Sequence, residues 1–534
     1  MHVSVDQQKM LITALHNPSI FPHVSNDWQL IETHISWVIL CGDFAYKIKK
    51  ALDLGFLDCT TLDSRKFYCE EEMRLNSRLA PELYLQVVPI TGTSTQPQLG
   101  GTGPAFEYAV KMRRFPPAAL LSELVDGGQL RAAHIDQLSA KISDFHLNIS
   151  AATADMQFGE PQSVHAPARE NFDQLRERVS NTIYLEWIER LQEWTEREYQ
   201  RCNAILQQRK KLGFVRECHG DMHLGNMVMI DDMPLIFDGI EFNPDLYWID
   251  VMSDVAFLFM DLEHHGRRDY AFRFLNGYLE LTGDYAGLQV FRYYLVYRAI
   301  VRAKVASIRA DQQQNGVAQS ASVAELEQHL QLALNNSQPQ QPVLLVTHGL
   351  SGSGKSTLSA RLAESMGAIR IRSDRERQRV LGKGLRDAKA TAIETGVYSR
   401  SATAHTYEAL EQLAEIVLDA GYSAIIDATF LTREQRQPFK ALATRLVVPI
   451  RILSFQAEAE VLKQRITARQ SEGRDISEAD LNVLAHQMGE YTGLDTDEEC
   501  DVVLIDTQLS CSGQEMLDLI NKSLDRSTES GRHE

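Results

Sequence analysis

A glycine-rich segment two-thirds of the way along the chain places the strongest constraint on its fold. The segment reads Gly349, Leu350, Ser351, Gly352, Ser353, Gly354, Lys355, Ser356 and Thr357. A strand-like run, 343–347, precedes it and a helical pattern follows it, so the order strand, loop, helix is predicted. Glycines let successive N–H groups turn towards an anion, and the helix N-terminus adds partial positive charge. The segment therefore predicts a phosphate-binding loop, with a chance glycine-rich turn as the alternative.

The loop also predicts its ligands. Lys355 is expected to contact the β- and γ-phosphates of ATP, and the hydroxyl of Ser356 is expected to bind Mg²⁺. We therefore expect ATP and Mg²⁺ as cofactors. Short apolar runs alternate with amphipathic helical patterns in this half of the chain, which is typical of a parallel sheet covered by helices. The runs are 343–346, 424–426, 451–455 and 502–505.

A second motif ends an expected strand with a carboxylate. Its residues are Ile371, Arg372, Ser373 and Asp374. With this motif and the loop, the region 343–507 resembles the small P-loop kinases, which include gluconate kinases, chloramphenicol phosphotransferases, the zeta-toxin group and polynucleotide kinases. The resemblance implies that Asp374 takes the proton from an acceptor hydroxyl as it attacks the γ-phosphoryl group. The alternative is that Asp374 only caps the helix beginning at Arg375.

The same resemblance implies roles for three more residues. Asp427, at the end of another expected strand, corresponds to the aspartate that holds a Mg²⁺-bound water. Arg465 and Arg469 lie four residues apart on one helical face, like the lid arginines that neutralise charge on the transferred phosphoryl group. The alternative for this pair is a solvated face that pairs with Glu458 and Glu460.

Other charged residues in this half carry weaker signals. Arg433 and Arg436 follow Asp427 closely and are candidates for contacting the acceptor. Arg474, just beyond Gly473, would extend the lid. The acidic segment 497–499 is expected to be a surface loop.

An unrelated signature lies upstream of the loop. It reads His219, Gly220, Asp221, Met222, His223, Leu224, Gly225 and Asn226. Asp221 precedes Asn226 by five residues, the spacing between the catalytic aspartate and the Mg²⁺-binding asparagine of protein-kinase-like enzymes. A strand, a turn and a second strand over 227–238 would return Asp238 beside Asn226, so that two oxygen ligands meet at one cation. A His/Asp-rich metal site is the alternative.

Residues around this signature are expected to support it. His219 is predicted to be a structural hydrogen-bonding residue, and Asp250 and Asp254 are predicted to brace the loop or to cap the next helix. Nearer the start of the chain, the strand 44–50 carries a lysine for the α- and β-phosphates. Lys47 and Lys49 share one face of that strand. Lys47 is favoured, because the neighbouring Tyr46 and Ile48 are the better buried partners.

A helix over 64–79 follows, and it carries the expected partner of that lysine. Glu72 shares a face with Leu75 and Leu79, so Glu72 is expected to point inward, with Glu71 as the alternative. The segment 108–116 is predicted to be the last strand and the hinge of this lobe.

These features together resemble a family of bacterial two-domain proteins, the bifunctional aminoglycoside phosphotransferase/ATP-binding proteins, and the resemblance spans nearly the whole chain. The matching phrases are 55–58, 79–85 and 237–243. The resemblance implies a mixed α/β and α+β multidomain chain. It comprises a two-lobed protein-kinase-like domain at 1–335, a linker at 336–342 and an AAA-type P-loop kinase domain with a parallel sheet at 343–534.

Composition limits the kinds of partner that we expect for this protein. A net charge of −18 argues against nucleic acid as the main partner, because proteins that bind a phosphate backbone gather a basic surface. The seven cysteines lack the close, repeated spacing of a zinc site or a disulfide framework. No export signal and no bilayer-length apolar run is present, so we expect a cytoplasmic protein without a membrane partner. The sequence carries no signal for the oligomeric state.

The sequence therefore predicts an enzyme with two ATP sites, each transferring a γ-phosphoryl group to a hydroxyl. A small-molecule acceptor is favoured because no activation segment follows Asp238. Two alternatives stay open: a nucleotide-sensing regulatory ATPase in which one domain controls the other, and a P-loop half that acts on polynucleotide ends or on sugar nucleotides.

Overall fold

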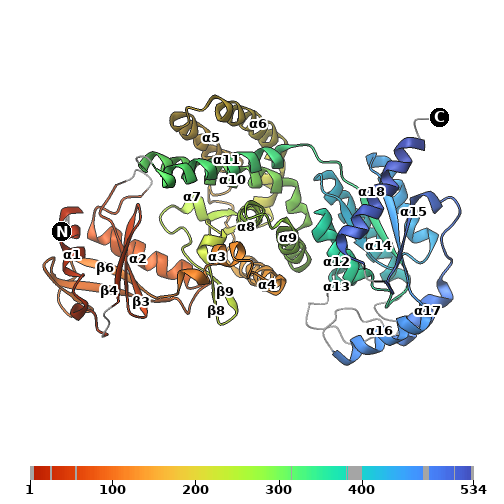
Figure 1. Ribbon diagram of the computed structural model, residues 1–534, viewed down its shortest axis with the longest axis horizontal. Coiled ribbons are helices and arrows are strands. Elements are labelled where there is room, and N and C mark those ends of the chain that lie inside the picture. The colour runs from red at the N-terminus through yellow and green to blue at the C-terminus, as the bar shows by residue number, and fades with distance from the viewer. Residues whose placement is uncertain are drawn as a thin grey trace. The chain divides into compact units, whose positions relative to one another are not determined.

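A computed structural model describes residues 5–23, 27–53, 57–313, 316–380, 382, 400–472, 480–509 and 511–530 (Figure 1). Contacts between residues divide the chain into two compact units. The first comprises Met1–His265 and Tyr293–Ala333, and the second comprises Gly266–Arg292 and Leu334–Glu534. The predicted boundary at 336–342 stays a prediction, and by contacts the segment 266–292 groups with the second unit.

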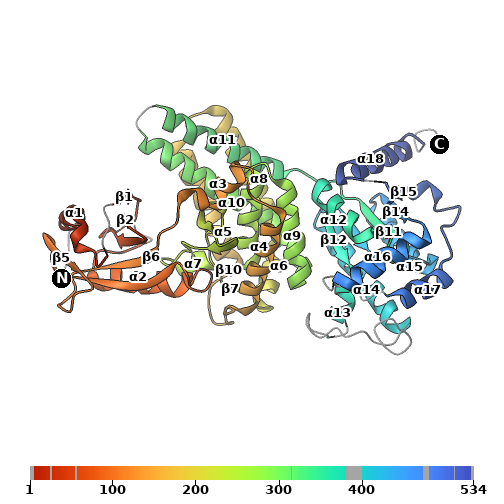
Figure 2. The same ribbon diagram turned by 60° about the horizontal axis from the view of Figure 1, so that its bottom comes forward.

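The first unit begins with a six-stranded antiparallel sheet of order β1-β2-β3-β6-β4-β5. Its strands are β1 (Trp28–Glu32), β2 (Ser36–Cys41), β3 (Phe44–Lys49), β4 (Tyr84–Thr93), β5 (Gln96–Leu99) and β6 (Glu107–Arg113). Helix α1 (Val5–Ala14) packs near β5, and helix α2 (Leu62–Asn76) packs on β4 and β6 (Figure 2). The strand predicted at 44–50, the helix predicted over 64–79 and the strand predicted within 108–116 are confirmed as β3, α2 and β6.

Helices and short hairpins make up the rest of the first unit. The helices are α3 (Leu121–Asp126), α4 (Ala132–Asn148), α5 (Pro161–Arg178), α6 (Thr182–Lys211), α7 (Pro244–Tyr247), α8 (Val251–His264), α10 (Leu288–Gln312) and α11 (Val317–Ser337). Strands β8 (Met227–Ile230) and β9 (Met233–Ile236) form the predicted hairpin, and β7 (Val215–Glu217) pairs with β10 (Trp248–Asp250). Helix α8 is buried along residues 251–262, as expected of a helix that is apolar all round.

The second unit has a five-stranded parallel sheet of order β12-β13-β11-β14-β15. Its strands are β11 (Leu344–His348), β12 (Ile369–Arg372), β13 (Ala424–Asp427), β14 (Ile450–Gln456) and β15 (Val502–Asp506). The parallel sheet predicted from the apolar runs is confirmed. Its helices are α9 (Arg268–Thr282), α12 (Lys355–Met366), α13 (Ser373–Val380), α14 (Arg400–Asp419), α15 (Arg433–Leu446), α16 (Ala459–Glu472), α17 (Leu481–Glu490) and α18 (Gly513–Ser530).

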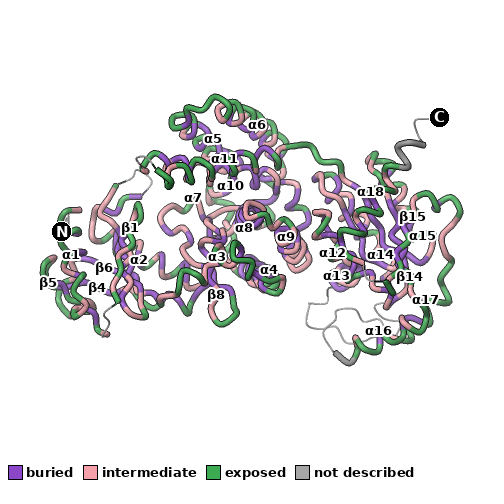
Figure 3. Tube along the Cα trace, in the orientation of Figure 1, coloured by how far each residue is buried: buried purple, intermediate pink, exposed green. Residues whose placement is uncertain are grey.

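Side-chain alternation along the strands divides the core of the second unit between two faces. Leu345, Ile425 and Leu453 are fully buried and pack with α12 and α18. Helix α14 packs on β12, β13 and α15. Every residue of β11 and β13 is buried, whereas α5 and α6 of the first unit carry many exposed residues (Figure 3). No helix in the described part of the chain has the length and apolarity that a bilayer span needs.

The structure corrects an expectation about charged residues in the second unit. Arg436 is 2% exposed, and its guanidinium donates two hydrogen bonds to Glu498, at 2.8 and 2.6 Å. The expectation that Arg436 contacts an acceptor is therefore wrong. The segment 497–499 lies at the surface as expected, with Asp497 and Glu499 exposed, although the Glu498 side chain is buried. Arg433 pairs instead with Asp495 and Asp497, and all three side chains are about half exposed.

The two arginines predict contrasting stability effects. Arg436→Met would leave the Glu498 carboxylate buried without its cation and should destabilise the second unit by about 3 kcal/mol. Arg433→Met breaks a solvated pair and should cause no measurable change. All five tryptophans lie before residue 249, in the first unit, so hydrogen exchange of the β13 amides during urea titration is the suitable measurement. Equal protection in both variants would contradict the prediction.

Candidate active sites

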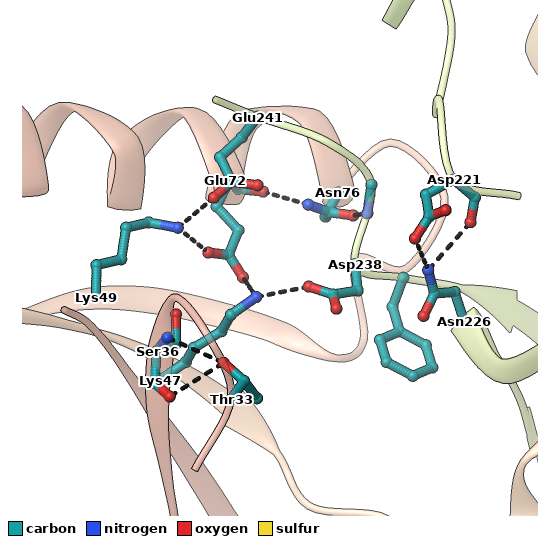
Figure 4. A network of polar contacts seen from close by, with 12 residues as sticks. Thr33, Ser36, Lys47, Lys49, Glu72, Asn76, Asp221, Asn226, Asp238 and Glu241 are labelled. Carbon is teal, nitrogen blue, oxygen red and sulfur yellow. Dashed lines mark hydrogen bonds and ion pairs between the residues drawn. The ribbon is translucent and has the colours of Figure 1, made fainter. Parts of the chain in front are cut away.

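A buried network of ion pairs lies where β3 and α2 of the first unit meet the segment after β9 (Figure 4). Lys47 Nζ donates to Glu72 Oε1 at 2.8 Å and to Asp238 Oδ1 at 2.5 Å. Lys49 Nζ donates to Glu72 Oε2 at 2.7 Å and also to Glu241. Glu72 therefore joins both lysines, and Lys47 in addition contacts Asp238.

The charged groups in this network shift one another's pKa values. Burial alone would raise the pKa of Glu72, but Lys47 and Lys49 lower it to about 2. Burial opposes the charge of Lys47, yet Asp238 and Glu72 raise the pKa of this lysine. Burial raises the pKa of Glu241 above its ordinary value. Glu71, the alternative considered from the sequence, pairs with Arg74 instead.

The loop between β7 and β8 holds the second group of predicted residues. Asn226 Nδ2 donates to Asp221 Oδ2 at 2.8 Å and to the Asp221 carbonyl oxygen at 3.0 Å. Phe237 N donates to the Asn226 carbonyl oxygen, so the hairpin returns Asp238 beside Asn226 as expected. Asp238 has a φ of 60°, and its N–H donates to Tyr84 Oη at 3.1 Å. A left-handed aspartate is strained, and such strain concentrates at functional sites.

The predicted braces of this loop are confirmed. Asp254 accepts hydrogen bonds from His219 N and Gly220 N at 2.8 and 2.9 Å. Asp250 caps α8 at Met252 N. His219 Nε2 lies 3.0 Å from the Phe237 carbonyl oxygen, and burial lowers the pKa of His219, which favours a neutral ring in a structural role.

The backbone of this loop depends on one glycine and on two further polar side chains that hydrogen-bond to it. At Gly220, where φ is +85°, an added Cβ would lie 2.6 Å from the Leu246 carbonyl oxygen. Sequence reasoning missed Asp261, which accepts from Leu224 N, and Arg298, which donates to the Gly220 carbonyl oxygen. Both lie far along the chain from the loop, and no local pattern pointed to them.

Asp221 is ionised under all ordinary conditions. Burial alone would raise its pKa, but His223 and His219 hold the pKa of Asp221 well below the usual range. A carboxylate of such low basicity is a weak base. It is therefore suited to accept a hydrogen bond from a hydroxyl and to orient it, and to take the proton only late in a reaction.

Three buried residues of this unit could form a metal site, but their contacts indicate that they support the loop. His146, Cys218 and Asp254 have ligand atoms within 4.8 Å of one another and are buried. Burial raises the pKa of the Cys218 thiol, so the thiolate that binds metals is disfavoured. The Asp254 carboxylate already accepts two N–H groups of the loop. We therefore assign this cluster to the support of the loop.

The phosphate-binding loop of the second unit has the backbone that its glycines predict. Gly349, Gly352 and Gly354 have φ values of 140°, 82° and 88°. An added Cβ at Gly352 would lie 2.8 Å from the Leu462 carbonyl oxygen, so the loop packs closely on α16. Lys355 Nζ donates to the Leu350 carbonyl oxygen at 2.8 Å, and burial lowers the pKa of Lys355 to about 8.

The aspartates predicted for this site end neighbouring strands. Asp427 ends β13 and accepts from Ser356 Oγ at 3.3 Å and from Ser359 Oγ at 3.2 Å. Asp374 lies in the first turn of α13, where Arg377 Nη1 is 3.3 Å from its Oδ1. Sequence reasoning missed Ser359, although its spacing of three from Ser356 on a helix was a usable signal.

A cavity of about 1730 Å³ joins these groups. Lys355, Asp374, Asp427, Arg465 and Arg469 all line it. Arg465 donates to Thr507 Oγ1 and to the Thr507 carbonyl oxygen at 2.9 and 2.8 Å. The structure thus brings the predicted residues of this unit to one cavity. Arg474 lies outside the described residues.

The two sites define a class of protein: a kinase or phosphotransferase with two kinase-like domains. The phosphotransferase enzyme family model matches residues 68–291, and the AAA domain model matches residues 344–494. Uncharacterised proteins of Mycobacterium tuberculosis and Mycobacterium bovis are each 30% identical over 460 residues, covering 86% of this chain and 90% of theirs. The chain belongs with them to a family of two-domain proteins that join a phosphotransferase-family domain to an AAA-type P-loop domain.

Solved structures similar to parts of the chain include kinases. A gluconokinase from Sinorhizobium meliloti 1021 has 18% identity, covering 36% of this chain and 98% of that one, with a TM-score of 0.26. A choline kinase from Cryptosporidium parvum Iowa II has 11% identity, covering 61% of this chain and 95% of that one, with a TM-score of 0.37. At these scores the two structures carry no argument about substrate.

The shifted pKa of Glu72 predicts a pH-dependent stability. Because the pKa falls from 4.5 to about 2 on folding, the stabilisation by Glu72 is fully present above pH 4.5 and is lost as the pH falls towards 2. The difference in unfolding free energy between wild type and Glu72→Gln should therefore be largest at neutral pH and should shrink below pH 4.5. Urea titration followed by tryptophan fluorescence, which reports the first unit, measures it.

Glu71→Gln is the matched control on the same helix. Its partner Arg74 is 47% exposed, so this variant should change the unfolding free energy little. A Glu72→Gln difference that does not vary with pH would contradict the assigned ion pairs.

Proposed function

We propose that each unit transfers the γ-phosphoryl group of ATP to a hydroxyl of a small molecule. The observation that carries the proposal is the convergence, in each unit, of a buried lysine and two carboxylates. In the first unit Lys47 pairs with Asp238, and Asp221 is held by Asn226, beside which the hairpin returns Asp238. In the second unit they are Lys355, Asp374 and Asp427, which line one cavity.

In the first unit, Lys47 would bind the α- and β-phosphates while Glu72 holds its ammonium group in place. Asp221 would accept a hydrogen bond from the acceptor hydroxyl. As the oxygen attacks the γ-phosphorus, the bond to the β–γ bridging oxygen breaks, ADP leaves and the hydroxyl proton passes to Asp221. The brace from Asp254 fixes the loop so that the carboxylate does not have to be ordered during the reaction.

In the second unit, the backbone N–H groups of the loop would cradle the phosphates. Lys355, held at the Leu350 carbonyl oxygen, would turn to the β- and γ-phosphates, and their negative charge would favour the protonated form of this lysine. Asp374 would accept the hydroxyl proton. Arg465 and Arg469 would neutralise charge developing on the transferred group.

The donor atoms at both sites fit Mg²⁺. Asn226 uses its Nδ2 on Asp221, which leaves its Oδ1 as an acceptor near the Asp238 carboxylate. Ser356 and Asp427 supply a hydroxyl and a carboxylate 3.3 Å apart. Oxygen ligands of this kind suit a hard cation. Mg²⁺ bound at each site would neutralise the phosphate oxygens. Asn226 and Asp238 would hold it in the first unit, and Ser356 and Asp427 would hold it in the second.

Charged side chains of both signs line the second cavity. Glu408, Glu411 and Glu434 line it on α14 and α15, and Arg361, Arg372 and Arg377 line it as well. The choice of a small molecule over a polynucleotide end therefore rests on the net charge of −18 of the whole chain, because a polynucleotide binder gathers a basic surface.

The two transfers predict separable losses. Asp221→Asn should lower transfer in the first unit by about 10²–10⁴-fold, because no carboxylate remains to take the proton. Asp374→Asn should do the same only in the second unit. Incubating γ-labelled ATP and Mg²⁺ with a metabolite extract measures both, since each labelled product should vanish in one variant only.

Nucleotide binding provides the control for this assay. A fluorescent ATP analogue should still bind the full chain in both Asn variants, because neither aspartate is placed on the nucleotide. Intact binding without any labelled product from the wild-type chain would reject the proposal and favour the nucleotide-sensing function.

A further inference from the structure

Helix α9 packs on the edge of the sheet of the second unit although it ends more than sixty residues before the phosphate-binding loop. Strand β12 is an edge strand of that sheet. The side chain of Asn276 on α9 donates to the Ala368 carbonyl oxygen at 2.9 Å and accepts from Arg370 N at 2.7 Å. One amide thus pairs with an N–H and a C=O that an edge strand would otherwise leave open.

One turn further along α9, a single carboxylate meets three arginines of β12 and α13. Glu280 Oε1 accepts from Arg375 Nε at 2.8 Å and from Arg372 Nη1 at 3.1 Å, and Glu280 Oε2 lies 3.5 Å from Arg370 Nη2. The four side chains are only 11–14% exposed. Arg379 also donates to the Glu280 carbonyl oxygen at 2.9 Å. Helix α9 is therefore fixed to this segment by both side chain and backbone.

The arginines that Glu280 holds surround the proposed chemistry. Arg372 and Arg375 flank Asp374 in the sequence, and Arg372 lines the cavity. Arg370 donates to the Ser356 carbonyl oxygen at 2.7 Å and lies 3.9 Å from the Asp427 carboxylate. The charge on Glu280 therefore balances cations next to both aspartates of the site.

The electrostatics of Glu280 agree with this geometry. Burial alone would raise its pKa, but Arg372 and Arg370 outweigh burial and hold the pKa of Glu280 below its ordinary value. The carboxylate is thus ionised whenever the protein is folded near neutral pH. Without that charge the guanidinium groups would compete for Asp374 and Asp427, the other carboxylates within this region.

We propose that Glu280 is a positioning residue of the P-loop site. By pairing with Arg370, Arg372 and Arg375, its carboxylate limits how strongly these cations draw on the two aspartates that act on the acceptor and the metal. The inference rests on the proposed function of that site. It assigns a part of the phosphoryl-transfer machinery to a helix that lies inside the segment matched by the phosphotransferase family model.

The test uses the full chain with Asp221→Asn, so that the first unit contributes no transfer, and water as the acceptor. ATP hydrolysis with Mg²⁺ gives kcat, and a fluorescent ATP analogue gives nucleotide affinity. Glu280→Gln keeps the shape and removes the charge, so kcat should fall by about 10–100-fold, as for other residues that orient a site from behind it. Nucleotide affinity should change little, since Glu280 itself pairs with arginines of β12 and α13 rather than with the loop, and Arg370 keeps its hydrogen bond to the Ser356 carbonyl oxygen in the isosteric variant.

Two further variants separate positioning from folding. Glu280→Asp retains the charge and should recover most of the lost kcat. Arg273→Met breaks another α9 ion pair, to Glu364 at 2.7 Å, which involves neither β12 nor the cavity, and should leave kcat unchanged. An unchanged kcat in Glu280→Gln, or an equal loss in Arg273→Met, would overturn the inference. Bound nucleotide without hydrolysis in the parent chain would instead reject the proposed function, and the inference with it.

Discussion

The fold of the first unit depends on the pairing of two lysine charges inside it. Lys47 and Lys49 project from the same face of β3, and placing two ammonium groups in a protein interior costs several kcal/mol each unless carboxylates compensate them. Glu72 on α2 meets both, and Asp238 and Glu241 bring in the segment after β9. Three distant stretches of chain are thereby held at one point, so the residues proposed to bind phosphate are also the ones that join the lobe together.

The proposed phosphate site of the second unit is built differently from that of the first. Its loop relies on backbone N–H groups and on glycines with positive φ, and its lysine has a pKa lowered to about 8. The carboxylate of Asp427 is held by two hydroxyl groups, with an arginine only at 3.9 Å. The first unit keeps its charges paired before any ligand binds, whereas the second keeps its lysine on a neutral carbonyl. We expect ligand charge to change protonation more in the second site than in the first.

Sequence reasoning predicted those parts of the two sites whose residues lie close together in the chain at recognisable spacings. The phosphate-binding loop, the pair Asp221 and Asn226, and the hairpin that returns Asp238 all follow from patterns within about twenty residues. The pairing of Lys49 with Glu241 joins residues 192 apart, and that of Arg436 with Glu498 joins residues 62 apart. No spacing rule relates such positions. For Arg436, nearness to Asp427 in the sequence suggested a site role, but the side chain turns into the core.

Helix α9 shows why family boundaries and compact units need not coincide. A family model records which residues recur along a sequence, while a compact unit records which residues touch, and α9 falls within the first family's segment but contacts the second sheet. A P-loop unit without α9 would expose the edge of β12 and would remove the Glu280 carboxylate that three arginines share. Both consequences are costly, since an open edge invites aggregation and unpaired buried cations destabilise a fold. The segment matched by one family thus supplies structure to the unit that holds the other.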